Sequence, residues 1–303
     1  MKGEPAAPAA RVDRRLEAAR DSLELILDGV LRPGHWAARL ARLVGLQGAP
    51  TVSRFAVSSS ELPASMQPLR LVFASDFHAG ATTHPVIFAR ALEAIRGEDP
   101  DIVLLGGDFV TVRGSYIREL VPMLAALDPP LGKFAVLGNH DLRANQATLS
   151  AGLADADVRV LSNSCVKLPA PFDAVTLCGL DDPIRGRPDA KSAMDGADGA
   201  RVVIMHAPDG LLTLGDRRFC LALCGHTHGG QIALPGGRPI ILPAGRLSRT
   251  YAAGRFDLDR GRTLIVSRGV GCSTVPARLF ASSEIVSVLL SGSRVDSQRE
   301  ELP

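Results

Sequence analysis

The stretch that decides the fold runs from Leu69 to His78 and reads LRLVFASDFH. It begins as a mostly apolar run, typical of a strand that is buried on both faces, and it ends in the polar pair Asp76 and His78. Four later stretches repeat this pattern: DIVLLGGD (101–108), KFAVLGNHD (133–141), RVVIMH (201–206) and FCLALCGHTH (219–228). The repetition predicts strands of an α/β sheet whose carboxyl ends carry the chemistry.

Helix-like segments separate these runs. Val86–Ile95 and Ile117–Leu127 have apolar residues at helical spacing, so the chain reads as β-α-β units of the α/β class. After Gly230 the sequence becomes rich in glycine and proline, with further strand-like runs at 262–269 and 284–292. These later runs predict a second sheet.

The strand ends together supply two aspartates, one asparagine and five histidines. These residues are Asp76, His78, Asp108, Asn139, His140, His206, His226 and His228. A lone buried histidine is usually a satisfied core residue, but packing alone does not explain five at consecutive strand ends. Imidazole and carboxylate ligands together suit Mn, Zn, Fe or Ni, and the set contains no cysteine, which a structural zinc site would normally use.

The donors are too many for one tetrahedral metal site. They fit two adjacent metals that share a carboxylate. Such a pair clamps the attacking and leaving oxygens of an in-line displacement and lowers the pKa of a bridging water.

The order of these blocks resembles the signature of the calcineurin-like metallophosphoesterases, over roughly residues 50 to 292. The matching blocks are Asp76-x-His78, Gly107-Asp108, Gly138-Asn139-His140-Asp141, His206 and Gly225-His226-Thr227-His228. The resemblance implies a four-layer α-β-β-α double β-sandwich fold. It also implies two divalent metal ions as cofactors.

The resemblance implies a role for each residue of the blocks. Asp76, His78 and His228 would bind the first metal, Asp108 would bridge, and Asn139, His206 and His226 would bind the second. A metal-bridging hydroxide would attack phosphorus in line, and His140 would protonate the leaving oxygen as general acid. Asp141 would orient His140 or keep it protonated; a turn cap is the alternative for Asp141.

Three arginines are candidates for binding substrate. Many family members carry a second acid shortly after the Gly-Asp pair, whereas this chain has Arg113 nearby, which would contact a phosphate or simply lie on the surface. The extended block GHTHGGQ (225–231) resembles a bacterial branch in which some members cleave UDP-diacylglucosamine or related phosphodiesters. Arg268 and Arg278 would then bind a diphosphate, or be structural.

The charge balance argues against nucleic acid as a partner, because the net charge is only +2. Residues 231–280 nevertheless hold eight arginines against two acids. This basic stretch favours an anionic substrate, or is a solvated arginine-rich surface.

The chain divides into three predicted parts. Residues 1–49 form a disordered tip and amphipathic helices, residues 50–292 the metallophosphoesterase domain, and residues 293–303 a flexible tail. A basic amphipathic helix beginning at Trp36 could lie on an anionic membrane or pack on its own domain. With no apolar run of membrane-spanning length and five unpatterned cysteines, we expect a cytoplasmic protein, in peripheral contact with the inner membrane if that helix binds lipid.

The sequence therefore predicts a metal-dependent hydrolase of phosphodiester or pyrophosphate bonds. Its substrate would be a phosphorylated small molecule or a lipid-linked nucleotide. One alternative is a phosphomonoesterase, such as a phosphoprotein phosphatase, because the blocks do not separate diesters from monoesters. The other is a non-catalytic scaffold of the same fold, which would normally lose a ligand or the residue equivalent to His140.

Overall fold

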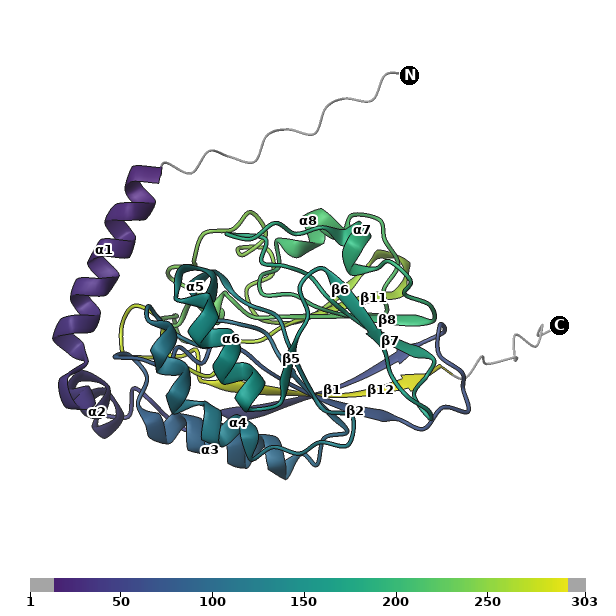
Figure 1. The fold of residues 1–303 in the computed structure, drawn as a ribbon, viewed down its shortest axis with the longest axis horizontal. Coiled ribbons are helices and arrows are strands. Elements are labelled where there is room, and N and C mark those ends of the chain that lie inside the picture. The colour runs from purple at the N-terminus through teal and green to yellow at the C-terminus, as the bar shows by residue number, and fades with distance from the viewer. Residues whose placement is uncertain (1–13, 294–303) are drawn as a thin grey trace, which may run out of the picture.

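The computed structural model describes the backbone of residues 14–293 and the side chains of residues 21–293. Two six-stranded sheets pack face to face, and helices lie over their outer faces (Figure 1). This arrangement confirms the predicted α-β-β-α layers. The predictions of a disordered tip before residue 11 and of a flexible tail after residue 293 lie outside the described residues.

The first sheet contains three of the five apolar runs. Its strand order is β1 (Thr51–Ser59), β12 (Glu284–Gly292), β2 (Leu69–Ala74), β3 (Ile102–Leu105), β4 (Lys133–Ala135) and β5 (Val158–Val160). The last four strands in this order are parallel to one another. The polar residues that follow β2, β3 and β4 are therefore carried to the same edge of the sheet.

The second sheet contains the other two apolar runs. Its order is β10 (Gly254–Leu258), β11 (Arg262–Val266), β9 (Leu221–Cys224), β8 (Ala200–Ile204), β7 (Val175–Gly179) and β6 (Ser164–Lys167). The four strands from β11 to β7 are parallel. The prediction that residues 284–292 belong to this sheet is wrong. They form β12, which lies between β1 and β2 in the first sheet, so that the backbone N–H and C=O groups on both of its edges are paired.

The helices are α1 (Arg14–Leu31), α2 (Trp36–Leu43), α3 (Pro85–Gly97), α4 (Val121–Ala125), α5 (Asn139–Arg143), α6 (Gln146–Asp155), α7 (Ala190–Ala193) and α8 (Gly210–Leu214). The outer face of the first sheet is covered by α3, α4 and α6, and that of the second by α7 and α8, whereas α1 and α2 lie at the side of the sandwich (Figure 1). The helix predicted at 117–127 is split into a 3-10 turn (Gly114–Glu119) and α4, because Pro122 lacks the N–H needed to continue a helix and suits a helix start. No helix in the described range has both the length and the apolar character needed to cross a bilayer.

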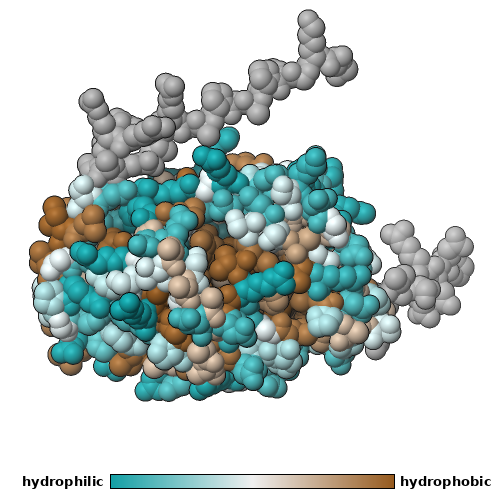
Figure 2. Space-filling model, viewed as in Figure 1, coloured by the Kyte–Doolittle hydropathy of each residue, from teal (hydrophilic) through white to brown (hydrophobic). Residues whose placement is uncertain are grey.

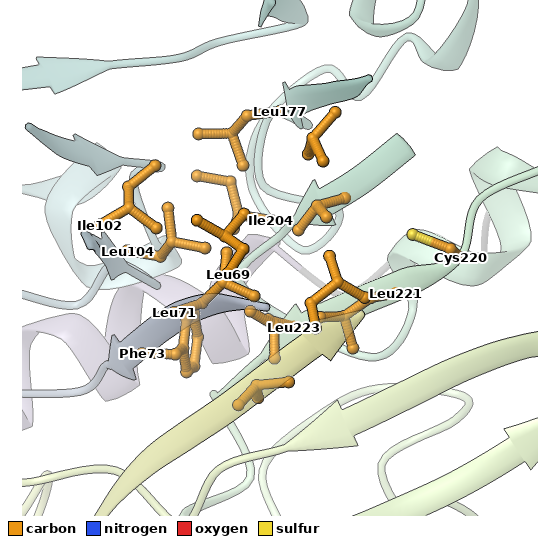
Figure 3. Close-up of a cluster of buried hydrophobic side chains, with 14 of the residues drawn as sticks. Leu69, Leu71, Phe73, Ile102, Leu104, Leu177, Ile204, Cys220, Leu221 and Leu223 are labelled. Carbon is orange, nitrogen blue, oxygen red and sulfur yellow. The ribbon is translucent and has the colours of Figure 1, made fainter. Parts of the chain in front are cut away.

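Alternate side chains of each strand enter different cores. In β2, Leu71 and Phe73 point into the layer between the two sheets, whose packing is drawn in Figure 3. Val72 and Ala74 point to the opposite side, into the core that α3, α4 and α6 cover. Because both faces of these strands are buried, polar side chains that belong to a site are gathered at the strand ends.

Candidate metal centre

The polar residues of the five blocks gather where the carboxyl ends of both sheets meet. Asp76 and His78 follow β2, Asp108 follows β3, Asn139 begins α5 after β4, His206 follows β8, and His226 and His228 follow β9. All of these except Asn139 are buried. The double sandwich thus brings together ligand-type side chains that are up to 152 positions apart in the sequence.

The backbone at these strand ends turns sharply. The left-handed conformation occurs at Asp76 (φ 55°), His78 (φ 47°), Asp108 (φ 52°), His226 (φ 70°) and His228 (φ 53°). Residues other than glycine adopt this conformation rarely and at an energetic cost. Such residues cluster at functional sites, where the surrounding structure holds them in place.

A first group consists of Asp76, His78 and His228, whose ligand atoms lie within 4.8 Å of one another. The Nε2 atoms of His78 and His228 are 3.0 Å apart. The Nε2 atom of His228 lies 3.5 Å from Oδ1 of Asp76. Three buried electron-pair donors therefore converge on one point.

A second group consists of Asp108, His206 and His226, again within 4.8 Å of one another. The Nε2 atom of His206 lies 3.2 Å from Nδ1 of His226 and 3.1 Å from Oδ1 of Asn139. Asp108 connects the two groups, because its Oδ2 atom lies 3.2 Å from Nε2 of His206 and 3.6 Å from Nε2 of His78.

Backbone carbonyls fix which nitrogen of two imidazoles faces the centre. Nδ1 of His206 lies 2.8 Å from the carbonyl oxygen of Gly106, and Nε2 of His226 lies 2.9 Å from that of Ala244. Each of these nitrogens donates its proton to the carbonyl and so turns the other ring nitrogen, Nε2 of His206 or Nδ1 of His226, towards the centre. Metal-binding histidines commonly use this arrangement.

Burial keeps most of these imidazoles neutral, the form that binds metals. It lowers the pKa of His226 to about 3 and holds the pKa of His78 and His228 well below the ordinary value. At His206 burial also opposes the charged form, but Asp108 outweighs it and raises the pKa well above the ordinary value. A divalent cation between Asp108 and His206 would take the place of that proton, so the donor set fits metals.

His140 lies beside this centre, within 4.8 Å of both His78 and Asp108 by its ring nitrogen. Its backbone N–H donates to Oδ1 of Asp108 at 2.8 Å, which holds α5 against the centre. Its Nδ1 atom is 2.8 Å from the carbonyl oxygen of Thr111 and also contacts the guanidinium of Arg143. Burial lowers the pKa of His140, and Arg143 lowers it further, although Asp108 opposes both.

Asp141 has a different place from the one expected. Its carboxylate accepts hydrogen bonds from the backbone N–H groups of Phe109, Val110 and Gly138, at 2.9, 3.3 and 3.0 Å. It thus ties the loop after β3 to the start of α5. These contacts are those of the alternative role for Asp141, a cap of the local backbone. Burial, with the charge of Asp108, raises its pKa to about 8.

The three candidate substrate arginines lie in different surroundings. Arg113 is half exposed and pairs with Asp28 of α1 at 3.1 Å. Arg278 is buried and donates to backbone carbonyls, including those of Gly271 and Ala281, and to Nδ1 of His228 at 3.0 Å. These contacts hold the buried side chain of Arg278 on the backbone, whereas only the Nε atom of Arg113 is held, by α1.

Arg268 differs from the other two arginines. Its Nη2 atom pairs with Glu284 at 2.9 Å, but its buried Nε atom has no hydrogen-bond partner within the described part of the chain. Its side chain lies against Gly229, next to the metal-ligand candidate His228. Of the three arginines, Arg268 keeps donor capacity beside the centre.

The sequence analysis did not predict two residues that lie beside His140, Arg143 and Glu24. Arg143 binds Oε2 of Glu24 at 2.5 Å and Oδ1 of Asp21 at 2.6 Å, so helix α1 reaches the centre through one arginine. The position of Arg143, three residues after His140, is a local signal for their contact. No local signal pairs Arg143 with Glu24, because 119 positions separate them.

Comparisons with known proteins identify the family. The calcineurin-like phosphoesterase family profile matches residues 69–230, more than half of the chain. The chain is 30% identical over 236 residues to the metallophosphoesterase YkuE of Bacillus subtilis, covering 76% of this chain and 81% of that protein. It is 30% identical over 212 residues to the phosphodiesterase YaeI of Escherichia coli, covering 67% and 76% respectively.

A solved structure, the NAD nucleotidase NadN of Haemophilus influenzae, is similar with a TM-score of 0.45 and 13% identity, covering 69% of this chain and 46% of that one. The family profile spans all of the residues that converge at the strand ends. The chain therefore belongs to the calcineurin-like phosphoesterases and is a metal-dependent phosphoesterase.

Proposed function

We propose that this chain hydrolyses phosphodiester or pyrophosphate bonds with the help of two divalent metal ions. The observation that carries the proposal is the position of Asp108. One oxygen of its carboxylate lies 3.2 Å from a nitrogen of His206 and 3.6 Å from a nitrogen of His78. A carboxylate oxygen shared between two groups of donors is what a pair of adjacent metals requires.

The proposed ligands divide between these two groups of donors. The first metal is held by Asp76, His78 and His228, the second by Asn139, His206 and His226, and both by Asp108. Mn, Zn, Fe and Ni all suit these ligands. When bound, the metals supply positive charge for a phosphate and a water whose pKa is lowered.

His140 is proposed as the general acid. Thr111 and Arg143 hold its Nδ1 side, so its other nitrogen is the one available for a substrate. Its pKa is lowered in the protein alone, but an anionic phosphate bound beside it favours the protonated form. His140 then gives that proton to the oxygen that leaves phosphorus. Asp141 contributes by fixing the backbone on which His140 sits.

Preference for diesters is supported by the likeness to YaeI, which is called a phosphodiesterase. Arg268, with an unused donor next to Gly229, is proposed to bind a second phosphate or another anionic group of the substrate. A phosphorylated small molecule or a lipid-linked nucleotide has such a group. Arg113 and Arg278 are proposed to serve the structure instead.

The catalytic domain is proposed to span residues 50–292, with residues 1–49 added to it and residues 293–303 as a tail. Both sheets lie between residues 50 and 292. All five cysteines are free thiols, which supports a reducing, cytoplasmic compartment.

The test measures metal content and hydrolysis of bis-p-nitrophenyl phosphate in the same preparations. We expect about two metals per chain in the natural protein. Asp108→Asn should lose metal and activity together, whereas Asp128→Asn, at an exposed aspartate that precedes β4 while the ligand block follows that strand, should keep both. One metal or none after reconstitution, with no hydrolysis, would overturn the proposal. Faster turnover of p-nitrophenyl phosphate than of the diester would favour a phosphomonoesterase.

A further inference from the structure

Helix α1 is amphipathic, but it turns its polar side towards the protein. Asp28 accepts hydrogen bonds from Tyr116 at 2.6 Å and Arg113 at 3.1 Å, while Glu24 and Asp21 bind Arg143. Both Glu24 and Asp28 are buried. The acidic side of α1 is therefore the side that holds it to the domain.

The opposite side of α1 is apolar and faces outward. Leu23, Ile26 and Val30, at spacings of three and four residues, are 55%, 64% and 59% exposed. The sequence predicted amphipathic helices in residues 1–49, but not the direction of their apolar sides. Burying such a stripe is the usual reason for an amphipathic helix, so an outward stripe marks a surface made for a partner.

Helix α2 extends the same surface. Its alanines pack inward, whereas Trp36, Leu40 and Leu43 are exposed, Leu43 at 83%. Figure 2 shows apolar residues along the edge of the molecule where α1 and α2 lie in Figure 1. We call these six side chains the apolar surface: Leu23, Ile26, Val30, Trp36, Leu40 and Leu43.

Two loops connect α2 to the metal centre. The backbone N–H of Arg278 donates to the carbonyl oxygen of Leu46, just after α2, at 2.8 Å, and the side chain of Arg278 contacts His228. Leu279, in the same loop, forms a bridge with Ile232 of the second loop. Leu279 and its neighbour Phe280 are exposed, as are Ile240 and Ile241 in the second loop. Exposed apolar side chains therefore continue from α2 to loops beside the centre.

Three arginines on α2 and the second loop lie near these exposed apolar side chains and have no carboxylate partner among residues 21–293. Arg39 and Arg42 on α2 and Arg238 in the second loop are exposed, and none forms an ion pair with any side chain of residues 21–293. By contrast, Asp28 on α1 is paired with Arg113, and Arg32, between the two helices, is paired with Glu119. The unpaired charges complement an anionic partner.

We propose that the apolar surface docks on an anionic lipid bilayer, with Arg39, Arg42 and Arg238 at the level of the phosphates. Apolar side chains that enter the headgroup region, flanked by arginines, are the pattern by which amphipathic helices bind such bilayers. Trp36 is one of the aromatic residue types that are enriched at that depth. Docking brings the loops beside the metal centre to the lipid headgroups. The assigned substrates are therefore lipid phosphodiesters or pyrophosphates, an assignment that rests on the proposed function.

The test is co-sedimentation of the full chain with vesicles, which needs no catalysis. The vesicles are phosphatidylcholine alone or with about one third phosphatidylglycerol. Leu40→Gln/Leu43→Gln should lower the pelleted fraction roughly tenfold, since each leucine loses its apolar transfer energy. Leu212→Gln, at a leucine on α8 over the other sheet that is 49% exposed against 54% for Leu40, is the control and should pellet like the natural chain. Arg39→Gln/Arg42→Gln should remove the preference for phosphatidylglycerol.

Several outcomes would overturn the docking proposal. One is that anionic vesicles pellet no more of the chain than phosphatidylcholine vesicles do. Another is that Leu212→Gln lowers the pelleted fraction as much as Leu40→Gln/Leu43→Gln. A third is that vesicles bind nothing and analytical ultracentrifugation shows a dimer that Leu40→Gln/Leu43→Gln dissociates. Hydrolysis of bis-p-nitrophenyl phosphate, measured without vesicles, should be unchanged in Leu40→Gln/Leu43→Gln. A chain that pellets with vesicles but hydrolyses no ester would overturn the proposed function and leave the docking intact.

Discussion

The metal centre and helix α1 meet at His140, yet they are held in opposite ways. The centre consists of polar side chains enclosed by apolar layers, on a backbone that several strained residues fix. Helix α1 presents its acids to the domain and leaves Leu23 and Ile26 to the solvent. The centre depends on the whole sandwich, whereas α1 depends on a few ion pairs.

This difference predicts how each region responds to change. A Cβ added at Gly138 or Gly225 would displace ligands, because it would lie 2.3 Å from Oδ1 of Asp108 or 2.1 Å from Oδ2 of Asp76. Changes on the outward side of α1 meet only solvent, while changes to its acids act on Arg143 and, through it, on His140. The two regions should therefore differ in their response to substitution and to pH.

The largest contrast is expected between two glycines. A Cβ at Gly138 would lie 2.3 Å from Oδ1 of Asp108 and 2.7 Å from Cε1 of His206, so Gly138→Ala should abolish metal binding and hydrolysis. Gly29 in α1 has no atom within 4 Å of an added Cβ, and Gly29→Ala should instead stabilise the helix by about 0.5–1 kcal/mol. Metal content and thermal unfolding measure both. A metal-loaded, active Gly138→Ala would show that the centre is looser than its packing indicates.

The second prediction separates His140 from the metal ligands. His140→Gln should lower kcat for a diester by about 10²–10⁴-fold, the usual contribution of a general acid, while about two metals stay bound. The loss should be smaller for a substrate whose leaving group needs no proton, such as a nitrophenolate. Loss of one metal in this variant would instead make His140 a ligand, which its distance from His78 and Asp108 also allows.

The third prediction concerns pH and the centre alone. Burial raises the pKa of Asp141 to about 8, and Asp108 raises that of His206 well above its ordinary value. Groups with raised pKa values bind more protons in the folded chain, so the stability they add is lost as pH rises through those values. The histidines with lowered pKa values titrate below about 6.5 in either state and add little above it.

The metal-free chain should therefore unfold at a lower temperature at pH 8.5 than at pH 6.5, by about 2–4 °C for each kcal/mol lost. Metal-loaded protein should show a smaller fall, because the cations replace the protons. Asp21→Asn, on α1, should leave the difference unchanged, because the pKa of Asp21 is lowered rather than raised and its titration ends well below pH 6.5. A Tm that rises over this range without metal would contradict the raised pKa values of Asp141 and His206.

The contrast between the metal centre and α1 also explains which parts of the structure the sequence could predict. The blocks at the ends of β2, β3, β4, β8 and β9 were predictable because each combines an apolar run with ligand residues in a few positions. The place of β12 was not, since its pairing with β1 and β2 depends on which edge of the first sheet is open. The direction of α1 was not either, because periodicity identifies an apolar stripe but not the side on which ion-pair partners such as Arg143 lie.

The smallest effect is expected at Glu24, where α1 touches the chemistry. Glu24 lies 3.9 Å from Nδ1 of His140 and favours its protonated form, while Arg143 opposes it. Glu24→Gln removes that negative charge, so the pKa of His140 in the substrate complex should fall and kcat at pH 8 should drop roughly 3- to 10-fold, with a smaller drop at pH 6, where more of the imidazole is protonated. The matched control is Leu23→Gln, one residue earlier on the outward side, which should leave the pH profile of a soluble diester unchanged. Equal losses in both variants at every pH would mean that α1 acts by its general stability, whereas a shifted alkaline limb in Glu24→Gln alone would make this helix a positioning part of the active site.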